Sequence, residues 1–126
     1  MKDLEQEIAG YLKERRWDTM TPADMAKSIS IEAAELLELF QWDNKSIADT
    51  KSDEARMNKI RGELADVFIY CLDMAVLLGI DSETIVREKL EHNKKKYPAS
   101  EMKRESNKSH ERYIEIKEQY RDEKRS

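Results

Sequence analysis

The segment Ile31-Glu-Ala-Ala-Glu-Leu-Leu-Glu-Leu-Phe40 places two carboxylates three positions apart within a run of apolar residues. Residues three or four positions apart lie on the same face of an α-helix, so Glu32 and Glu35 share one face of a helix that is otherwise almost entirely apolar. A second segment, Glu63-Leu-Ala-Asp-Val-Phe-Ile-Tyr70, repeats this arrangement with its first and fourth residues. The two segments predict a helical fold in which acidic pairs lie on the most hydrophobic helix surfaces of the chain.

The sequence around these segments predicts further helices joined by short connections. With only 3 Gly and 2 Pro among 126 residues, the composition favours long helices over a β fold with many turns. The predicted helices run from about Asp3 to Arg16, from Pro22 to Phe40, from a cap at Ser52 or Asp53 to Leu78, from a cap at Asp81 or Ser82 to just before Pro98, and from Ser109 to Lys124. We expect Thr21 to cap the second helix, Gly79 to end the third, and the polar residues 43–52 to form a loop.

These helices predict an all-α fold, with a helical bundle of four main helices and a C-terminal fifth helix. Residues 1–98 form the predicted domain, and residues 99–126 form a charged, partly helical C-terminal extension. Helices with broad apolar faces leave hydrophobic surface for another subunit to cover. We therefore expect an oligomer, either a homodimer or a homotetramer.

Charge and composition argue against several functional classes. The net charge of −4 disfavours a nucleic-acid partner, and Asp73 interrupts the longest apolar stretch, Val67 to Ile80, which disfavours a membrane span. Acids near the N-terminus disfavour a signal peptide, and the single Cys71 cannot support a disulfide framework, so we expect a cytoplasmic protein. Acidic residues predominate in residues 1–86 and basic residues in 87–126, a distribution that suits a polyanionic ligand bound through a metal.

The two acidic pairs have an ordinary interpretation and a functional one. In a charge-rich helix, carboxylates usually face solvent and pair with lysines four positions away. Here only Glu63 has a lysine at that distance, Lys59. Carboxylates that converge without cations repel one another, and a divalent cation would relieve the repulsion. The candidate metal ligands are Glu32, Glu35, Glu63 and Asp66.

The ligand chemistry of these four residues favours a hard cation. An all-oxygen ligand set suits Mg²⁺, with Mn²⁺ as the alternative. A di-iron centre in a helical bundle would need Glu-x-x-His on two helices. Neither His92 nor His110 has a Glu three positions before it, so the sequence disfavours a di-iron centre.

Further stretches accompany the pairs Glu32-Ala-Ala-Glu35 and Glu63-Leu-Ala-Asp66. They are Glu38-Leu-Phe-Gln-Trp42, Asp66-Val-Phe-Ile-Tyr70, and Lys89 and Asn93 ahead of Lys96-Tyr97-Pro98. In order and spacing, these motifs resemble the MazG-like all-α nucleoside triphosphate pyrophosphohydrolases, and within that family the dCTP pyrophosphatase branch. The resemblance covers residues 4 to 98, and the two acidic pairs are similar to the family's E-x-x-E and E-x-x-D metal-binding pairs.

The resemblance implies roles for individual residues. The four carboxylates would bind Mg²⁺ that bridges the triphosphate. The substrate-binding residues that it implies are Trp17, Trp42, Tyr70, Lys89, Asn93 and Lys96. The lysines and the asparagine would face the phosphates, with the tyrosine close by, and the two tryptophans would hold the base. Without the family, each tryptophan is equally well explained as a core or interface anchor. Glu38 is a candidate catalytic residue that orients water, or simply an exposed acid.

The implied activity is hydrolysis of a nucleoside triphosphate, dCTP or a modified dCTP, to the monophosphate and pyrophosphate, which would keep unwanted nucleotides out of the pool. The segment Asp18-Thr-Met-Thr-Pro22 lacks the His that the dCTP branch tends to place there, so the base stays open. Gly62 also stands where the branch usually has another acid. One alternative is a dUTP-preferring or broad-specificity hydrolase. Another is a non-enzymatic helical adaptor that dimerises through its apolar faces.

Overall fold

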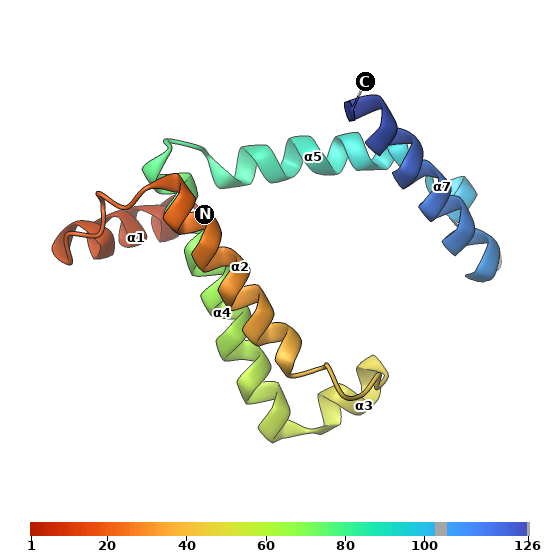
Figure 1. Cartoon of the computed structure of the whole chain (residues 1–126), viewed down its shortest axis with the longest axis horizontal. Coiled ribbons are helices and arrows are strands. Elements are labelled where there is room, and N and C mark those ends of the chain that lie inside the picture. The colour runs from red at the N-terminus through yellow and green to blue at the C-terminus, as the bar shows by residue number, and fades with distance from the viewer. Residues whose placement is uncertain (103–105, 126) are drawn as a thin grey trace. The chain divides into compact units, whose positions relative to one another are not determined.

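The computed structural model describes residues 1–102 and 106–125, with side chains described for residues 1–102 and 111–123 (Figure 1). The helices in these ranges are α1 (Lys2–Glu14), α2 (Pro22–Glu38), α3 (Ile47–Ser52), α4 (Glu54–Leu77), α5 (Ser82–Lys96), α6 (Ala99–Met102) and α7 (Ser106–Arg125). No strand occurs in the part of the chain that is described, so the predicted all-α class is confirmed. None of these helices is long and apolar enough to cross a membrane.

The chain forms two compact units, Met1–Ser82 and Glu83–Ser126. The division falls near the start of α5. The predicted boundary after residue 98 marks the end of the family-like motifs, and it stays a prediction.

The long helix α4 is the centre of the first unit. α1, α2 and α3 all pack against it, and α2 lies alongside it for most of its length (Figure 1). Ile8 and Leu12 of α1 are buried against Leu72 of α4, and Met25 of α2 is only 1% exposed. Burial of such side chains stabilises a fold by about 1.5–3 kcal/mol each, which explains why the apolar stripe of α1 lies on α4.

The ends of α2 and α4 follow the capping signals in the sequence. The Thr21 hydroxyl accepts a hydrogen bond from the Asp24 N–H at 3.2 Å, and Pro22 occupies the first helical position. The Asp53 carboxylate accepts from the Arg56 N–H at 3.1 Å at the start of α4. Gly79 adopts φ +66°, the left-handed conformation that ends many helices, after α4. The predicted roles of Thr21 and Gly79 are confirmed, and of the two caps predicted for α4 the structure has Asp53.

Residues 43–52 are not the continuous loop that we predicted. Ile47–Ser52 form α3, and the Ser46 hydroxyl caps it by accepting from the Asp49 N–H at 3.1 Å. Ser46 and Asp49 provide a cap and a first-turn acid, which stabilise a helix start even in a polar segment. The prediction was wrong because the segment has little hydrophobic periodicity, although it contains the capping signal of Ser46.

Arg56 joins the turn after α2 to the first turn of α4. Its guanidinium donates to both carboxylate oxygens of Asp43, at 2.8 and 3.0 Å, and also to the Leu39 carbonyl. The group lies 4.9 Å from the centre of the Phe40 ring. A hydrogen bond from Arg56 lowers the pKa of Asp43. This two-point contact holds the end of α2 at a defined place on α4.

In the second unit, α7 packs through one buried apolar side chain, an aromatic contact and an ion pair. Ile116 is buried, the rings of Tyr97 and Tyr113 stack at 5.0 Å, and Arg112 pairs with Glu101 at 2.9 Å. The helix is longer than predicted, because it begins at Ser106, and the short α6 was not predicted. The C-terminal extension is therefore helical throughout most of its described length.

Candidate functional site

Three of the four predicted ligand carboxylates form a cluster between α2 and α4. One carboxylate oxygen from each of Glu32, Glu63 and Asp66 lies within 4.8 Å of the others. Glu32 comes from α2 and the other two from α4, so the cluster exists because these helices lie side by side (Figure 1). The two acidic pairs, distant in sequence, therefore meet as one group of oxygen ligands.

Glu35 and Glu38, on the same helix as Glu32, border the cluster. Glu35 is exposed, and it hydrogen-bonds with both Glu32 and Glu63. A hydrogen bond between two carboxyl groups requires that they share a proton, so these contacts report crowding of acids. The charge of Glu38 is close enough to raise the pKa of Glu63. All five acids of the two segments thus lie in one region, whereas their roles stay predictions.

The electrostatics of the cluster favour a bound cation. Removal from water raises the pKa of Glu32 and of Glu63, and hydrogen bonding with Glu35 and the neighbouring negative charges raise both further. One oxygen of each, Oε2, is buried without a hydrogen-bond partner. Among the described residues, no Lys or Arg forms an ion pair with any of the cluster's acids. Unpartnered, mutually repelling carboxylate oxygens fit a hard divalent ion.

A cavity of about 310 Å³ adjoins the cluster. Its lining residues are Tyr11, Leu12, Trp17, Met20, Asp66, Ile69, Tyr70 and Asp73. Asp66 belongs to both the cluster and the cavity wall, so the two share a boundary. The rings of Tyr11 and Trp17 meet edge to face at 5.8 Å. The cavity is therefore an aromatic and apolar space beside a group of oxygen ligands, the combination that small-molecule sites commonly show.

Tyr70 lines the cavity and lies near Glu32 and Asp66 of the cluster. Burial raises the pKa of its hydroxyl, and the negative charges of Glu32 and Asp73 raise it further. The hydroxyl consequently stays protonated and able to donate a hydrogen bond. The structure places Tyr70 near the acidic cluster, and its predicted contact with the substrate stays a prediction.

Trp42 lies away from this cavity within one chain. It is 88% exposed after the end of α2, where it lines a separate pocket with Arg56 and Lys59. Arg56 and Asp73 are both on α4, and at the helical rise per residue they lie about 25 Å apart along its axis. The two predicted base-binding tryptophans therefore do not meet on one ligand within a single chain.

Lys89, Asn93 and Lys96 belong to the second unit. Lys89 and Asn93 lie on one face of α5 and line a shallow pocket of about 500 Å³ with Ile85, Val86 and Leu90. The Lys96 ammonium lies 4.7 Å from the centre of the Tyr120 ring and 5.1 Å from that of Tyr97. Their predicted contact with phosphates stays a prediction.

Asp73 and Tyr11 are cavity residues that the sequence analysis did not select. Asp73 interrupts the apolar stretch of α4, and it follows Glu63, Asp66 and Tyr70 at spacings of three and four residues. This spacing puts it on the same helix face as the acidic pair, which is a signal that the sequence contains. Tyr11 has no such signal, because aromatic residues on an amphipathic helix usually belong to the core.

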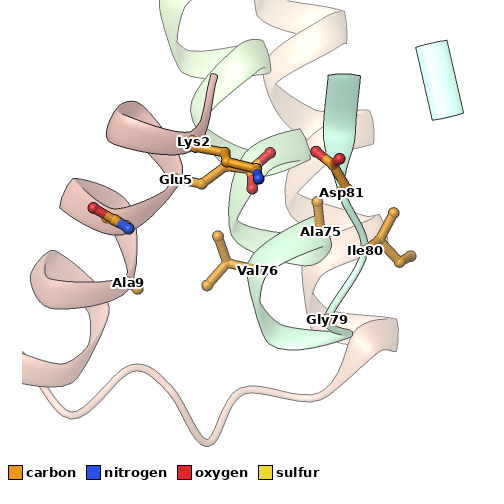
Figure 2. A pocket seen from close by; sticks show the side chains of 9 residues that line it. Lys2, Glu5, Ala9, Ala75, Val76, Gly79, Ile80 and Asp81 are labelled. Atoms are coloured by element: carbon orange, nitrogen blue, oxygen red, sulfur yellow. The ribbon is translucent and has the colours of Figure 1, made fainter. Parts of the chain in front are cut away.

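Another pocket, of about 490 Å³, lies between the start of α1 and the end of α4 (Figure 2). Glu5 of α1 accepts a hydrogen bond from the Ser82 N–H at 3.1 Å. Ala75, Val76 and Gly79 form the opposite wall, and none of the clustered acids lines this pocket (Figure 2). This hydrogen bond joins the first helix to the segment after α4. A structural role therefore accounts for the polar residues of this region.

The chain is similar to known proteins over most of the region that contains these residues. The MazG-like family matches residues 27–111. Human dCTP pyrophosphatase 1 is 29% identical over 101 residues, which cover 79% of this chain and 59% of that protein, and rat dCTP pyrophosphatase 1 is 27% identical over 100 residues. The chain thus spans about three-fifths of the length of the curated relatives that it matches.

A solved structure is also similar. The crystal structure of a pyrophosphatase from Archaeoglobus fulgidus superposes with a TM-score of 0.69 at 38% sequence identity. The match covers 78% of this chain and 92% of that chain. The likeness therefore extends over nearly the whole of the archaeal protein.

Proposed function

The chain belongs to the MazG-like family, and from this membership and the acidic cluster we propose that it is a magnesium-dependent nucleoside triphosphate pyrophosphohydrolase. The proposed substrate is dCTP or a modified dCTP, because the curated relatives are named dCTP pyrophosphatases. Water would attack the α-phosphorus, the bond from that phosphorus to the bridging oxygen would break, and a monophosphate and pyrophosphate would leave. A dUTP-preferring or broadly acting hydrolase is the alternative within this class.

The observation that carries the proposal is the cluster of unpartnered acids. Glu32, Glu63 and Asp66 would hold the metal, since one oxygen of each lies within 4.8 Å of the others and Oε2 of both glutamates is buried without a hydrogen-bond partner. Glu35, which lies beside Glu32 and Glu63, would be the fourth ligand. Mg²⁺, or Mn²⁺ in its place, supplies activation of water and neutralisation of charge on the leaving group when bound. Without the ion, the negative charges of these acids repel one another. The bound ion would neutralise them and so allow the acids to lie close together.

Other residues of the chain would position the substrate. Glu38 is close to Glu63, where a carboxylate can accept the proton of the attacking water. Trp17 and Tyr70 line the cavity beside the cluster, and they would contact the base and the adjoining part of the nucleotide. Lys89, Asn93 and Lys96 would neutralise the pyrophosphate. Trp42, exposed in one chain, would reach a base only in a homodimer or homotetramer.

The test is a panel of deoxynucleoside triphosphates incubated with and without Mg²⁺, with release of pyrophosphate as the measurement. We expect magnesium-dependent release, and we expect Glu63→Gln to abolish it while the protein keeps its helical circular dichroism spectrum. A single removed ligand charge weakens metal binding without opening a cavity in the core.

Glu54→Gln is the matched control, because Glu54 is an exposed glutamate on the same helix and pairs with Arg61 across the surface. It should retain the activity of the unsubstituted protein. A helical adaptor without enzymatic activity predicts no release of pyrophosphate from any nucleotide and no effect of Mg²⁺ on stability. Full activity of Glu63→Gln would contradict the assignment of the metal ligands.

A further inference from the structure

Asp73 is a buried acid that the proposed mechanism does not use. It lies within α4 and is only 3% exposed, and its Oδ1 atom has no hydrogen-bond partner. Among the described residues, no Lys or Arg forms an ion pair with it. A polar group that is buried without a partner destabilises a fold, and an apolar residue at this position would avoid that cost. The presence of an acid here is therefore explained better by a ligand than by folding.

The position of Asp73 gives it access to a ligand that also reaches the acidic cluster. Asp66, Tyr70 and Asp73 all line the same cavity, and they follow one another along one face of α4. Seven residues of helix separate Asp66 from Asp73, a rise of about 10 Å. A molecule that occupies the cavity can thus contact both Asp66 of the cluster and Asp73.

The remaining walls of the cavity suit a flat ring. Trp17 and Tyr11 contribute aromatic faces and edges, and Leu12, Met20 and Ile69 contribute apolar surface. The volume of about 310 Å³ is at the small end of the range for small-molecule sites. A single heterocyclic ring fits such a space better than a fused pair of rings.

We propose that Asp73 reads the base of the nucleotide, by hydrogen-bonding the edge of a pyrimidine that enters this cavity. The inference rests on the proposed function, which supplies the nucleotide, and it deepens that function by naming a residue that determines specificity.

A carboxyl group matches the edge of cytosine in particular. Burial raises the pKa of Asp73, which favours its protonated form. A protonated carboxyl has a donor and an acceptor side by side. The O–H donates to the ring N3 of cytosine, and the carbonyl oxygen accepts from the 4-amino group. An asparagine side chain offers the same two groups in almost the same shape, whereas leucine offers neither.

The first experiment compares dCTP with the triphosphate whose pyrimidinone ring lacks the 4-amino group, together with the other deoxynucleotides. We expect the unsubstituted protein to prefer dCTP in kcat/KM, and Asp73→Leu to reduce this preference at least about tenfold, since sites built around a hydrogen bond reject analogues that lack it. Asp73→Asn should keep the preference. Asp49→Leu, which replaces an exposed acid on α3 outside the cavity, should leave the preference unchanged.

The second experiment separates this inference from the proposed activity. Isothermal titration calorimetry measures binding of free 2′-deoxycytidine without metal or phosphate, and it needs no other substitution. Asp73→Leu should weaken binding at least about tenfold, and Asp73→Asn should not.

The two measurements fail in different ways. If no nucleotide is hydrolysed but nucleoside binding depends on Asp73, the proposed function is wrong and Asp73 still reads a base. If nucleotides are hydrolysed while neither base preference nor nucleoside binding changes in Asp73→Leu, the inference is overturned and the activity stands. Absence of any base preference in the unsubstituted protein overturns the inference as well.

Discussion

Glu32 and Glu63 each keep one carboxylate oxygen buried without a hydrogen-bond partner. In both, the pKa is raised above the ordinary value of 4.5, first by removal from water. An acid whose folded pKa is raised stabilises the fold fully below its unfolded pKa, and that contribution is lost as the pH rises through the folded pKa. The metal-free protein therefore contains a site that opposes folding when its acids ionise.

We predict that the metal-free protein loses thermal stability as the pH rises from about 4.5 toward neutrality. Mg²⁺ should restore stability at neutral pH, because an ion that binds only the folded state stabilises it. Thermal unfolding midpoints over this range, with and without Mg²⁺, provide the measurement. The double variant Glu32→Gln/Glu63→Gln should show a flatter pH dependence and no response to Mg²⁺. A midpoint that Mg²⁺ fails to raise in the unsubstituted protein would count against the metal site.

At the scale of the element, α4 contains one glycine and is followed by another. The two have opposite effects on the stability of the fold. Gly62 lies inside the helix and Gly79 adopts φ +66° after its end, and a Cβ added at either position would meet no atom within 4 Å. Space therefore does not distinguish them, and only the backbone conformation does. A helical backbone prefers alanine, whereas the left-handed conformation prefers glycine.

We predict that Gly62→Ala increases the free energy of unfolding by about 0.5–1 kcal/mol, and that Gly79→Ala decreases it by about 1–2 kcal/mol. Urea denaturation followed by circular dichroism gives both values. Gly10→Ala in α1 is a control for the first variant, since it also lies within a helix with open space around it. Effects of the same sign at positions 62 and 79 would contradict the described end of α4.

The local features of the fold could be predicted because their causes are local. Thr21 and Gly79 act through residues within one turn of helix, and the spacing in both acidic pairs depends only on the helical repeat. α3 was missed because its polar segment has little hydrophobic periodicity, although Ser46 provides a capping signal. The pairing of α2 with α4 was likewise only implied by the two acidic faces, since a helix face does not specify its partner.

The candidate site was predictable to the same extent. The sequence predicts that Glu32 and Glu63 are both metal ligands. In the structure, one carboxylate oxygen of each lies within 4.8 Å of the other. Asp73 was treated only as an interruption of an apolar stretch, because its burial depends on α1 and on the segment around Trp17. The separation of Trp17 from Trp42 depends on the length of α4, which no motif encodes.

At the scale of the whole molecule, the first unit exposes large apolar side chains on the two helices that form the cluster. Ile31 and Leu37 of α2 are 58% and 64% exposed, and Phe68 of α4 is 58% exposed. Several exposed residues of this size on paired helices are typical of a surface that another protein covers. They support the predicted homodimer or homotetramer.

We predict that sedimentation equilibrium gives a mass of at least twice that of one chain for the unsubstituted protein. Phe68→Glu should shift the population toward single chains, because a buried charge without a partner disfavours an interface. Ile47→Glu, which replaces an exposed isoleucine on the short α3, should not shift it. A single-chain mass for the unsubstituted protein would remove the oligomer from the proposal.

Cys71 is the single cysteine of the sequence, and it is exposed on α4 directly after Tyr70. No disulfide can form within the chain, so any disulfide must join two molecules through this helix. Air oxidation would then trap a covalent pair whenever two copies of α4 come close to one another. The same thiol allows a spin label or a fluorophore to be attached at one position, one residue from the wall of the cavity. A probe at Cys71 could thus follow ligand entry and subunit association in the same sample.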